Sequence, residues 1–444
     1  MTHGRPVQRV GTALAVFLLL AVVSSSAGGF MTVAAPVVRA AAAAPVVYET
    51  VLDNGVTVVV MPRGSDPPVA SVQVWIAAGG LDDPGGKEGL AHFFEHMVFG
   101  GSQKLAPGEF DRRIASVGGY SNASTSYDFT NYYATVPSEH VEELISLLGD
   151  LTTNPLFPQE LLEREREVIY REQEFRRDNP VRQAFEQVME HLMAGHPYGR
   201  SILGDRESVG SVTREDMLAF IEREYVPQRM FIVVVGDVDP ERVTEAARQA
   251  FGSIPQRPVP QRENPPLADL GERRPDRIVR DLEQSHLVLG WRGTAIKDPD
   301  VYAQEVLVTM LGLGRSSRLH RRLVREEGLV TWVSANGWFF RDHGALGVIA
   351  QLPPGHEDRV EQVVLEEIGR LKQGDFTEAE LERAKTLLLL SYASGLESTD
   401  AMAQALGNAL VTVGDWRWVL EYPDRIRSVS RDDVIRVARE YLPF

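Results

Sequence analysis

The chain has 444 residues, of which 43% are hydrophobic and 24% are charged, a composition typical of a soluble globular protein with room for two domains. A formal net charge of −16 argues against nucleic acid as a partner, because an acidic surface repels phosphates. No cysteine is present, which excludes disulfides and thiolate ligands, so any metal site must use His, Asp or Glu.

The N-terminal residues have the pattern of a secretory signal. Arg5 and Arg9 precede a short apolar run at residues 12–23, and small residues follow at 24–27. This order is typical of a signal peptide, and the run is shorter than the roughly 20 residues that a membrane-spanning helix needs. We therefore expect residues 1–44 to form a signal peptide and flexible leader, and the protein to be exported, to the periplasm or the medium, with no stable membrane span. A retained N-terminal anchor is the alternative.

From residue 45 onward the sequence alternates between strand and helix patterns. Residues 56–61 and 70–77 predict strands, a helix follows after two Gly-Gly pairs, and residues 124–136 predict a further strand. An apolar stripe predicts a helix at 139–151, and a proline then opens a long charged helix over residues 159–176.

Residues 254–278 are rich in Pro, Arg and Gln, which is typical of a linker between compact units. We therefore place a first, zinc-binding domain at residues 45–253 and a second, metal-free domain at 279–444. The second domain has a similar order of elements, with strands predicted at 286–291 and 346–352. The predicted fold class is α+β, with two homologous domains that each pack a mixed or antiparallel sheet against helices.

One five-residue pattern, His92-Phe93-Phe94-Glu95-His96, falls in the helix predicted after the second strand. In a helix, two histidines four residues apart share one face and can bind one zinc ion. The glutamate before the second histidine is close enough to serve a water at that metal. This H-x-x-E-H order is the inverted form of the zinc-peptidase pattern H-E-x-x-H. Because five letters also match by chance, the interpretation depends on the rest of the chain.

A catalytic zinc ion usually takes three protein ligands, so a third ligand is needed. The charged helix offers Glu165 and Glu172, which are two turns apart on one face. Ile169 lies near that face, which predicts that it packs inward, where an acid is costly unless it is paired or binds a metal. A solvated helix with surface salt bridges is the alternative.

The two predicted domains look like diverged copies. Both contain Leu-Glu-Arg in their long charged helix, at residues 162–164 and 381–383. Aligning these triplets places Ala384 and Ser391 opposite the two acids, and the second copy has no H-x-x-E-H. Loss of the acids in one copy suggests that they perform chemistry in the other rather than hold the fold.

Five motifs stand in one order: Gly-Leu-Ala-His-Phe-Phe-Glu-His at 89–96, Gly-Tyr-Ser-Asn-Ala-Ser at 119–124, Glu-Arg-Glu-Val-Ile-Tyr-Arg-Glu at 165–172, His-Pro-Tyr-Gly at 196–199 and Gly-Leu-Gly-Arg at 312–315. In this order they resemble the pitrilysin/insulinase family of zinc metallopeptidases, closest to the short two-domain type that includes mitochondrial processing peptidases. The resemblance covers the chain from about residue 48 to its end.

The resemblance implies a zinc-dependent endopeptidase that hydrolyses peptides or unfolded proteins with one zinc ion per chain and a metal-activated water. The site residues that it implies are the zinc ligands His92, His96 and Glu172, the general base Glu95, and a second acid near the metal, Glu165. Glu174 is a rival third ligand, but it breaks the seven-residue spacing.

Substrate contacts are also implied. Family members add a peptide as a strand to a sheet edge beside the metal, and residues 121–127 resemble that edge, with Asn122 and Ala123 at the site. An ordinary core strand is the alternative. The second domain of family members offers an arginine and a tyrosine; Arg325 is a candidate for the first, but Thr331 stands where the tyrosine is expected. A homologous metal-free subunit, or a second copy, is therefore expected to complete the site.

Two other functions stay open on the sequence. One is a non-catalytic assembly or core subunit of the same fold, against which the intact metal set argues. The other is a protease that acts on a single dedicated partner or precursor. Relatives usually continue with one more strand where this sequence stops, so we also expect an exposed sheet edge in the second domain.

Overall fold

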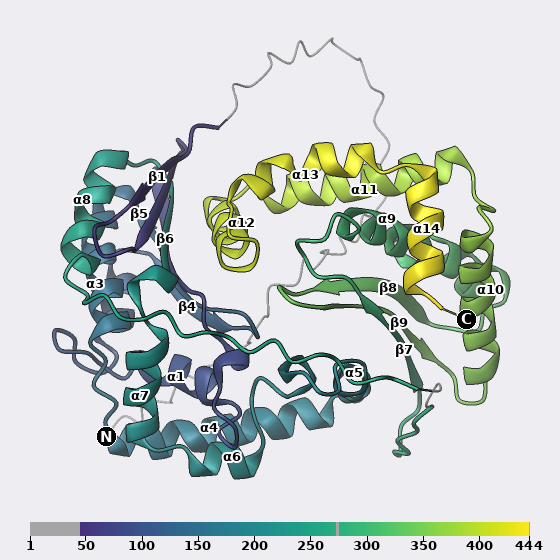
Figure 1. Cartoon of the computed structure of the whole chain (residues 1–444), viewed down its shortest axis with the longest axis horizontal. Helices are drawn as coiled ribbons and strands as arrows, with labels where there is room; N and C mark the ends of the chain where they lie inside the picture. Colours follow the sequence, from purple (N-terminus) through teal and green to yellow (C-terminus); the bar gives the residue numbers. More distant parts are fainter. Residues whose placement is uncertain (1–44, 272–274, 444) are drawn as a thin grey trace, which may run out of the picture.

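The computed structural model describes residues 45–271 and 275–443, so the predicted signal peptide and leader lie outside the described residues. Two halves, each built around a β-sheet, lie side by side (Figure 1). Within the described part of the chain, no helix has both the length and the apolar character needed to cross a membrane. The predicted α+β class with a sheet in each half is confirmed.

The first half contains a six-stranded mixed sheet in the order β1-β2-β6-β3-β5-β4. All neighbours are antiparallel except β2 and β6, which are parallel. The strands are β1 (Tyr48–Val51), β2 (Thr57–Pro62), β3 (Val69–Ile76), β4 (Tyr120–Thr125), β5 (Thr130–Pro137) and β6 (Met230–Gly236).

Both faces of this sheet are buried at its centre. In β2, Val58 and Val60 belong to the core under the helices of the first half, whereas Val59 and Met61 belong to a second core on the opposite face. A strand that is covered on both faces reads as a continuous apolar run, which explains the Val-Val-Val-Met sequence.

Eight α-helices lie in the first half. Helices α3 and α8 cover one face of the sheet (Figure 1). The helices are α1 (Leu90–Val98), α2 (Glu109–Ser116), α3 (Val141–Thr153), α4 (Gln159–Asp178), α5 (Pro180–Leu192), α6 (Arg206–Ser211), α7 (Arg214–Glu224) and α8 (Pro240–Phe251).

The strand predicted over residues 124–136 is wrong, because the structure has a hairpin there. Strand β4 ends at Thr125, and the amide of Ser126 donates to the carbonyl of Phe129 (2.8 Å) across the turn. The turn contains no Gly or Pro, and its aromatic residues pack inward, with Phe129 against Trp75 at 4.9 Å between ring centroids. Aromatic residues in the turn therefore extend the strand-like pattern through it.

The second half contains a three-stranded antiparallel sheet in the order β7-β9-β8. Among the described residues, the outer edge of β7 has no strand partner. The elements are the strands β7 (Ser285–Gly293), β8 (Trp332–Phe339) and β9 (Gly344–Leu352), the helices α9 (Val301–Gly312), α10 (Glu357–Lys372), α11 (Glu378–Gly395), α12 (Thr399–Thr412), α13 (Arg417–Ser428) and α14 (Arg431–Tyr441), and a π-helical segment, η5 (His320–Glu326).

The two halves exchange one helix each. Helix α5 packs against β7 and β9 of the second sheet, and α12 packs against β3 and β6 of the first (Figure 1). The contact of α12 is close: a Cβ atom on Gly407 would lie 2.1 Å from the indole nitrogen of Trp75. Each sheet therefore packs against a helix from the other predicted domain. The domain boundaries at residues 253 and 279 stay predictions.

The predicted linker, residues 254–278, is hydrogen-bonded to both halves. The guanidinium of Arg262 donates to both carboxylate oxygens of Asp82 (2.8 Å each) in the first half. Arg292 of β7 donates to the backbone oxygens of Leu192 (2.7 Å) and Ala268 (2.6 Å). These bonds tie the linker to the structure on either side of it.

A buried polar contact also joins the halves near the turn of the first hairpin. Tyr198 donates its hydroxyl to Asp128 (2.8 Å), and the backbone amide of Arg341, in the turn between β8 and β9, donates to the same carboxylate (3.1 Å). Next to this contact, the rings of His196 and His343 lie 4.8 Å apart between centroids and nearly perpendicular.

Candidate metal centre

Helix α1 presents two different faces. Phe93, Phe94 and Met97 are fully buried in the core of the first half. His92 and His96 lie on the side that faces α4, with 4.7 Å between their ring centroids. The apolar residues inside the five-residue pattern therefore fix the rotation of the helix and aim both imidazoles at α4.

The start of α1 is held by Asp83. Its carboxylate accepts hydrogen bonds from the amides of Gly89 and Ala91, at 2.8 Å each, which satisfies donors that a helix N-terminus leaves free. Gly89 has a φ of +93°, and a Cβ atom there would lie 2.6 Å from the carbonyl oxygen of Leu203. The turn into the helix therefore needs both this acid and this glycine.

Helix α4 brings the two acids to the histidines. Its buried residues include Leu162 and Ile169, so this side packs inward as the sequence predicts. Phe157, just before the helix, packs against Phe94 of α1 at 5.1 Å between ring centroids. Glu165 and Glu172 are both partly buried and face α1.

The three predicted ligands converge. The Oε2 atom of Glu172 lies 3.6 Å from Nε2 of His92 and 3.9 Å from Nε2 of His96. All ligand atoms of this trio lie within 4.8 Å of one another. Two imidazole nitrogens and one carboxylate oxygen form a typical donor set for catalytic zinc. The rival Glu174 is exposed and lies 3.9 Å from Arg206, away from the histidines.

Glu165 contacts the second histidine from the other side. Its Oε2 atom lies 3.4 Å from Nδ1 of His96, while its Oε1 atom accepts from Arg164 at 3.1 Å. Burial opposes the charge of Glu165, but the bonds from His96 and Arg164 outweigh it and lower the pKa of the carboxyl. A carboxylate on the far nitrogen of an imidazole orients the ring and raises its basicity as a ligand.

Glu95 lies beside His92, His96 and Glu172, and one of its carboxylate oxygens accepts a hydrogen bond. The hydroxyl of Thr125, at the end of β4, donates to Oε2 of Glu95 at 2.5 Å. Burial raises the pKa of Glu95, although His96 and the Thr125 hydroxyl act in the opposite direction. A raised pKa brings a carboxylate closer to the range in which it can accept and return a proton.

The pKa values of His92 and His96 are shifted in opposite directions. Burial, the neighbouring imidazole and Arg176 lower the pKa of His92 well below its usual range, which keeps it neutral. Burial would also lower the pKa of His96, but the carboxylates around it, of which Glu165 is the strongest, raise it instead. A neutral imidazole is the form that binds a metal.

Two functional partners were not predicted from the sequence. Arg176 donates to Oε1 of Glu172 at 3.2 Å. It lies four residues after Glu172, so helical spacing could have revealed it. Thr125, the partner of Glu95, could not be found this way, because its position depends on where the hairpin turns.

The predicted substrate residues lie in both halves. Asn122 and Ala123 are on β4, which is the edge strand of the first sheet and contacts α1. Arg325 is exposed on η5 in the second half. Thr331 donates its hydroxyl to the backbone oxygen of Gln351 in β9 at 3.1 Å, so it is held by the second sheet.

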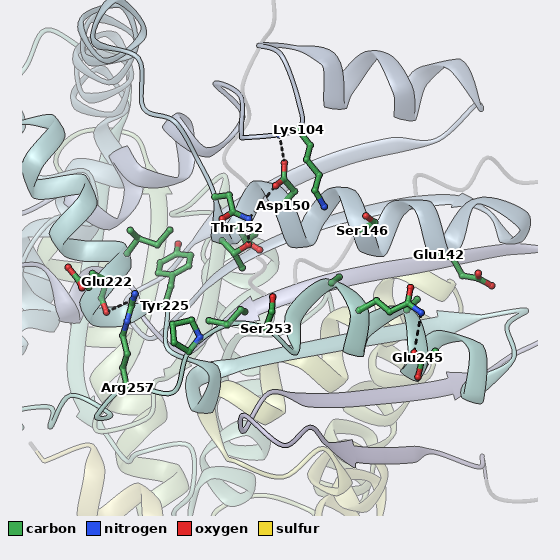
Figure 2. Close-up of a pocket in the computed structure, with 18 of the residues that line it drawn as sticks. Lys104, Glu142, Ser146, Asp150, Thr152, Glu222, Tyr225, Glu245, Ser253 and Arg257 are labelled. Carbon is green, nitrogen blue, oxygen red and sulfur yellow. Dashed lines mark hydrogen bonds between the residues drawn. The ribbon is translucent and has the colours of Figure 1, made fainter.

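A cavity of about 1100 Å³ opens elsewhere on the first half, between α3, α7 and α8 (Figure 2). It is lined by Asp150, Tyr225 and Arg257 among others, and none of the metal-centre residues belongs to it. The carboxylate of Asp150 is already bonded to the hydroxyl of Ser102 and the amide of Lys104. This cavity is therefore separate from the candidate metal centre.

Comparisons with known families match both halves. The model described as insulinase (peptidase family M16) matches residues 58–206, and the model described as the peptidase M16 inactive domain matches residues 211–388. This chain belongs to the M16 peptidase family. The predicted resemblance is confirmed. The inactive-domain match begins at residue 211, still in the first half, and continues through much of the second; the metal-centre residues all lie before it.

Individual relatives agree with the family match. An uncharacterized zinc protease of Mycobacterium leprae is 32% identical over 382 residues, which are 84% of each chain. The β subunit of the mitochondrial-processing peptidase of Lentinula edodes is 31% identical over 422 residues, covering 90% of this chain and 88% of that subunit. The crystal structure of a protease from Helicobacter pylori matches with a TM-score of 0.82 and 26% identity, covering 90% of this chain and 97% of that one.

Proposed function

We propose that this M16 protein is an exported zinc-dependent endopeptidase that cleaves peptides or unfolded proteins. The observation that carries the proposal is the approach of His92, His96 and Glu172 to one point, with Glu95 beside them. The names of relatives as zinc proteases support the metal. Export is proposed from the signal-like residues 1–44.

Zinc fits the donor set that the chain offers. Two imidazoles and one carboxylate leave a fourth position for water, as catalytic zinc sites do. The bond between Glu165 and His96 supplies the outer partner that such ligands usually have. When bound, zinc supplies Lewis acidity that lowers the pKa of a coordinated water to about 7.

The proposed role of Glu95 is to accept a proton from that water and to return it to the leaving amine. Thr125 holds one oxygen of Glu95, which leaves the other free for the proton. Burial excludes bulk water around the carboxylate and favours the uptake of the proton. Glu165 keeps the ring of His96 oriented and takes no part in proton transfer.

The edge of β4 is the proposed place of the substrate. A strand edge offers unpaired backbone groups, and an extended peptide can add to it as a further strand. Asn122 and Ala123 would then lie along the peptide backbone near the metal. This mode accepts extended chains, so peptides and unfolded segments are the proposed substrates.

We also propose that a second chain completes the substrate site. Arg325 is exposed in the second half, but the residue expected to be its tyrosine partner is Thr331, whose hydroxyl is bonded to β9. One relative is named as a subunit of a processing peptidase. A homologous metal-free subunit or a second copy of this chain would supply the missing group.

The test combines metal content with cleavage of an internally quenched peptide, on the protein alone and after co-expression with a metal-free homologue. We expect about one zinc ion per chain and cleavage that a chelator abolishes. Glu95→Gln should keep the zinc and lose cleavage by roughly 100- to 10,000-fold, the usual effect of removing a general base. Glu88→Gln, close in sequence, is the control and should cleave like the parent.

Unchanged cleavage by Glu95→Gln would refute the role of Glu95. A protein that binds no zinc and cleaves no peptide with or without a partner would instead support the non-catalytic assembly subunit. Cleavage of one precursor alone, with no cleavage of unrelated peptides, would indicate a dedicated processing enzyme.

A further inference from the structure

The two oxygen atoms of Glu172 have different partners. Oε2 points at both histidines, at 3.6 Å and 3.9 Å, while Oε1 accepts a hydrogen bond from Arg176 at 3.2 Å. The oxygen bonded to Arg176 is thus not the one in the two printed contacts with the histidines, both of which are made by Oε2. We propose that Arg176 is a positioning residue that makes Glu172 a one-oxygen ligand of the metal centre; this rests on the proposed zinc site.

The burial of Arg176 supports a role in holding Glu172. Arg176 and Arg177 both lie in the last turn of α4, where any cation is favourable to the helix dipole. Arg177 is exposed and can interact with the helix dipole without being buried. Only 14% of the Arg176 side chain, by contrast, is exposed. Burying a guanidinium costs free energy unless a partner compensates for it. Here the hydrogen-bonded partner is Glu172, and Glu186 of α5 is a further acid close to Arg176.

The second half offers an internal comparison. In the alignment that places Ser391 opposite Glu172, Gly395 stands opposite Arg176. The copy that lacks the acid therefore also lacks the arginine. Leu396 stands opposite Arg177 in the same alignment, so the copy without the acid lacks both arginines of this turn.

Two explanations of Arg176 predict opposite results. As a mere positive charge near the site, Arg176 repels a divalent cation, so its removal should tighten zinc binding. As a positioning residue, it restricts Glu172 to one orientation, so its removal should weaken zinc binding. The sign of the change in affinity therefore separates the two.

The experiment measures the zinc dissociation constant of the full chain by chelator competition. We expect Arg176→Met to weaken zinc binding by roughly 10- to 100-fold, the usual effect of losing an outer partner of a ligand. Arg176→Lys, which can still donate to Glu172, should recover part of the affinity. Arg177→Met, the matched control in the same turn, should bind zinc like the parent.

A second readout reports the coordination directly. The proposal predicts that loss of Arg176 lets Glu172 bind through both oxygens, which raises the coordination number of the metal. Visible absorption of protein-bound cobalt weakens as its coordination number rises. Cobalt-loaded Arg176→Met should therefore absorb less than the cobalt-loaded parent. Metal-free parent and variant are compared by thermal melting, so that a folding defect is recognised. Arg176→Met that binds zinc as tightly as the parent, or more tightly, overturns the proposal.

The proposed zinc site is tested separately with His92→Ala. If the parent binds zinc and this variant does not, the site stands and the arginine variants decide the role of Arg176. If both bind zinc equally, the proposed site itself is refuted.

Discussion

The two halves of this molecule are built from one pattern of elements but differ in chemistry. The order β3, α1, β4, β5, α3, α4 in the first half corresponds to β7, α9, β8, β9, α10, α11 in the second. Aligning Gly100, just after α1, with Gly312, the last residue of α9, places Gln304 opposite His92, and both side chains are buried. The second half thus keeps the helix and the packing without the metal-binding groups. The second half is folded without these groups, so we expect the first half to keep its stability when its metal ligands are replaced.

The halves also differ in what each contributes to the other. The second half supplies α12, which covers the inner face of the first sheet, and on that helix Gln404 accepts from Asn131 of β5 at 3.2 Å. Asn131 in turn accepts from Ser124 on the edge strand β4 at 2.5 Å. The half without ligands is therefore a structural support for the strand that adjoins the metal centre.

The largest effect is expected when the first half is given the residues of the second. Glu172→Ser and Glu165→Ala introduce the residues found at the matching positions, Ser391 and Ala384. Loss of an outer partner of a ligand is expected to weaken zinc binding by roughly 10- to 100-fold, and loss of a ligand should weaken it more. The loss of zinc affinity in Glu172→Ser should therefore exceed that in Glu165→Ala. Zinc affinity by chelator competition measures both, and thermal melting of the metal-free variants should stay close to the parent.

The reverse order, with Glu165→Ala weakening zinc more, would make Glu165 the ligand and refute the assignment of Glu172. A large fall in the melting temperature of either metal-free variant would show that these acids hold the fold, and the contrast between the halves would then fail.

The sequence was sufficient for features set by local spacing. The histidine pair on α1 and the acids on α4 follow from helical periodicity, and α4 begins at Gln159 as predicted and ends within two residues of the expected position. The exchange of α5 and α12 could not be predicted, because it depends on packing between residues far apart in the chain. Thr125 was missed for the same reason: its bond to Glu95 exists only once the hairpin has placed β4 beside α1.

An intermediate effect is expected at the exchanged helix. Gly407→Ala adds a Cβ atom that would lie 2.1 Å from the indole nitrogen of Trp75, so it should destabilise the protein by about 1–3 kcal/mol, as overpacking does. Gly369→Ala, also in a helix but with no atom within 4 Å of the added Cβ, should stabilise it by about 0.5–1 kcal/mol. Urea unfolding measures both changes.

Opposite signs for the two alanines would establish that the close approach of α12 matters for stability. If Gly407→Ala were neutral, the first sheet would tolerate a shift of α12, and the support that the second half gives to it would be weaker than the contacts indicate.

The smallest effect concerns the pH dependence of the contact between the halves. His196 and His343 face each other there with Asp342, Arg341, Arg292 and Asn264 close by, and both Nε2 atoms are buried without a partner among the described residues. Burial, and secondarily His343, lower the pKa of His196 to about 4. The unfolded chain keeps a histidine pKa of about 6.5. Below that value the unfolded state binds more protons, so the stability from this group is full above about pH 6.5 and is lost as pH falls towards 4.

His196→Asn should therefore flatten the pH dependence of stability. Between pH 7 and pH 5.5, the parent should lose about 1 kcal/mol more unfolding free energy than the variant, because only the parent has this histidine to protonate on unfolding. The difference between the two pH values is the readout, so a constant cost of the substitution cancels. His356→Asn, an exposed histidine in the second half, is the control and should keep the pH dependence of the parent. An unchanged slope in His196→Asn would mean that water reaches this contact, and that the halves meet there less tightly than at α5 and α12.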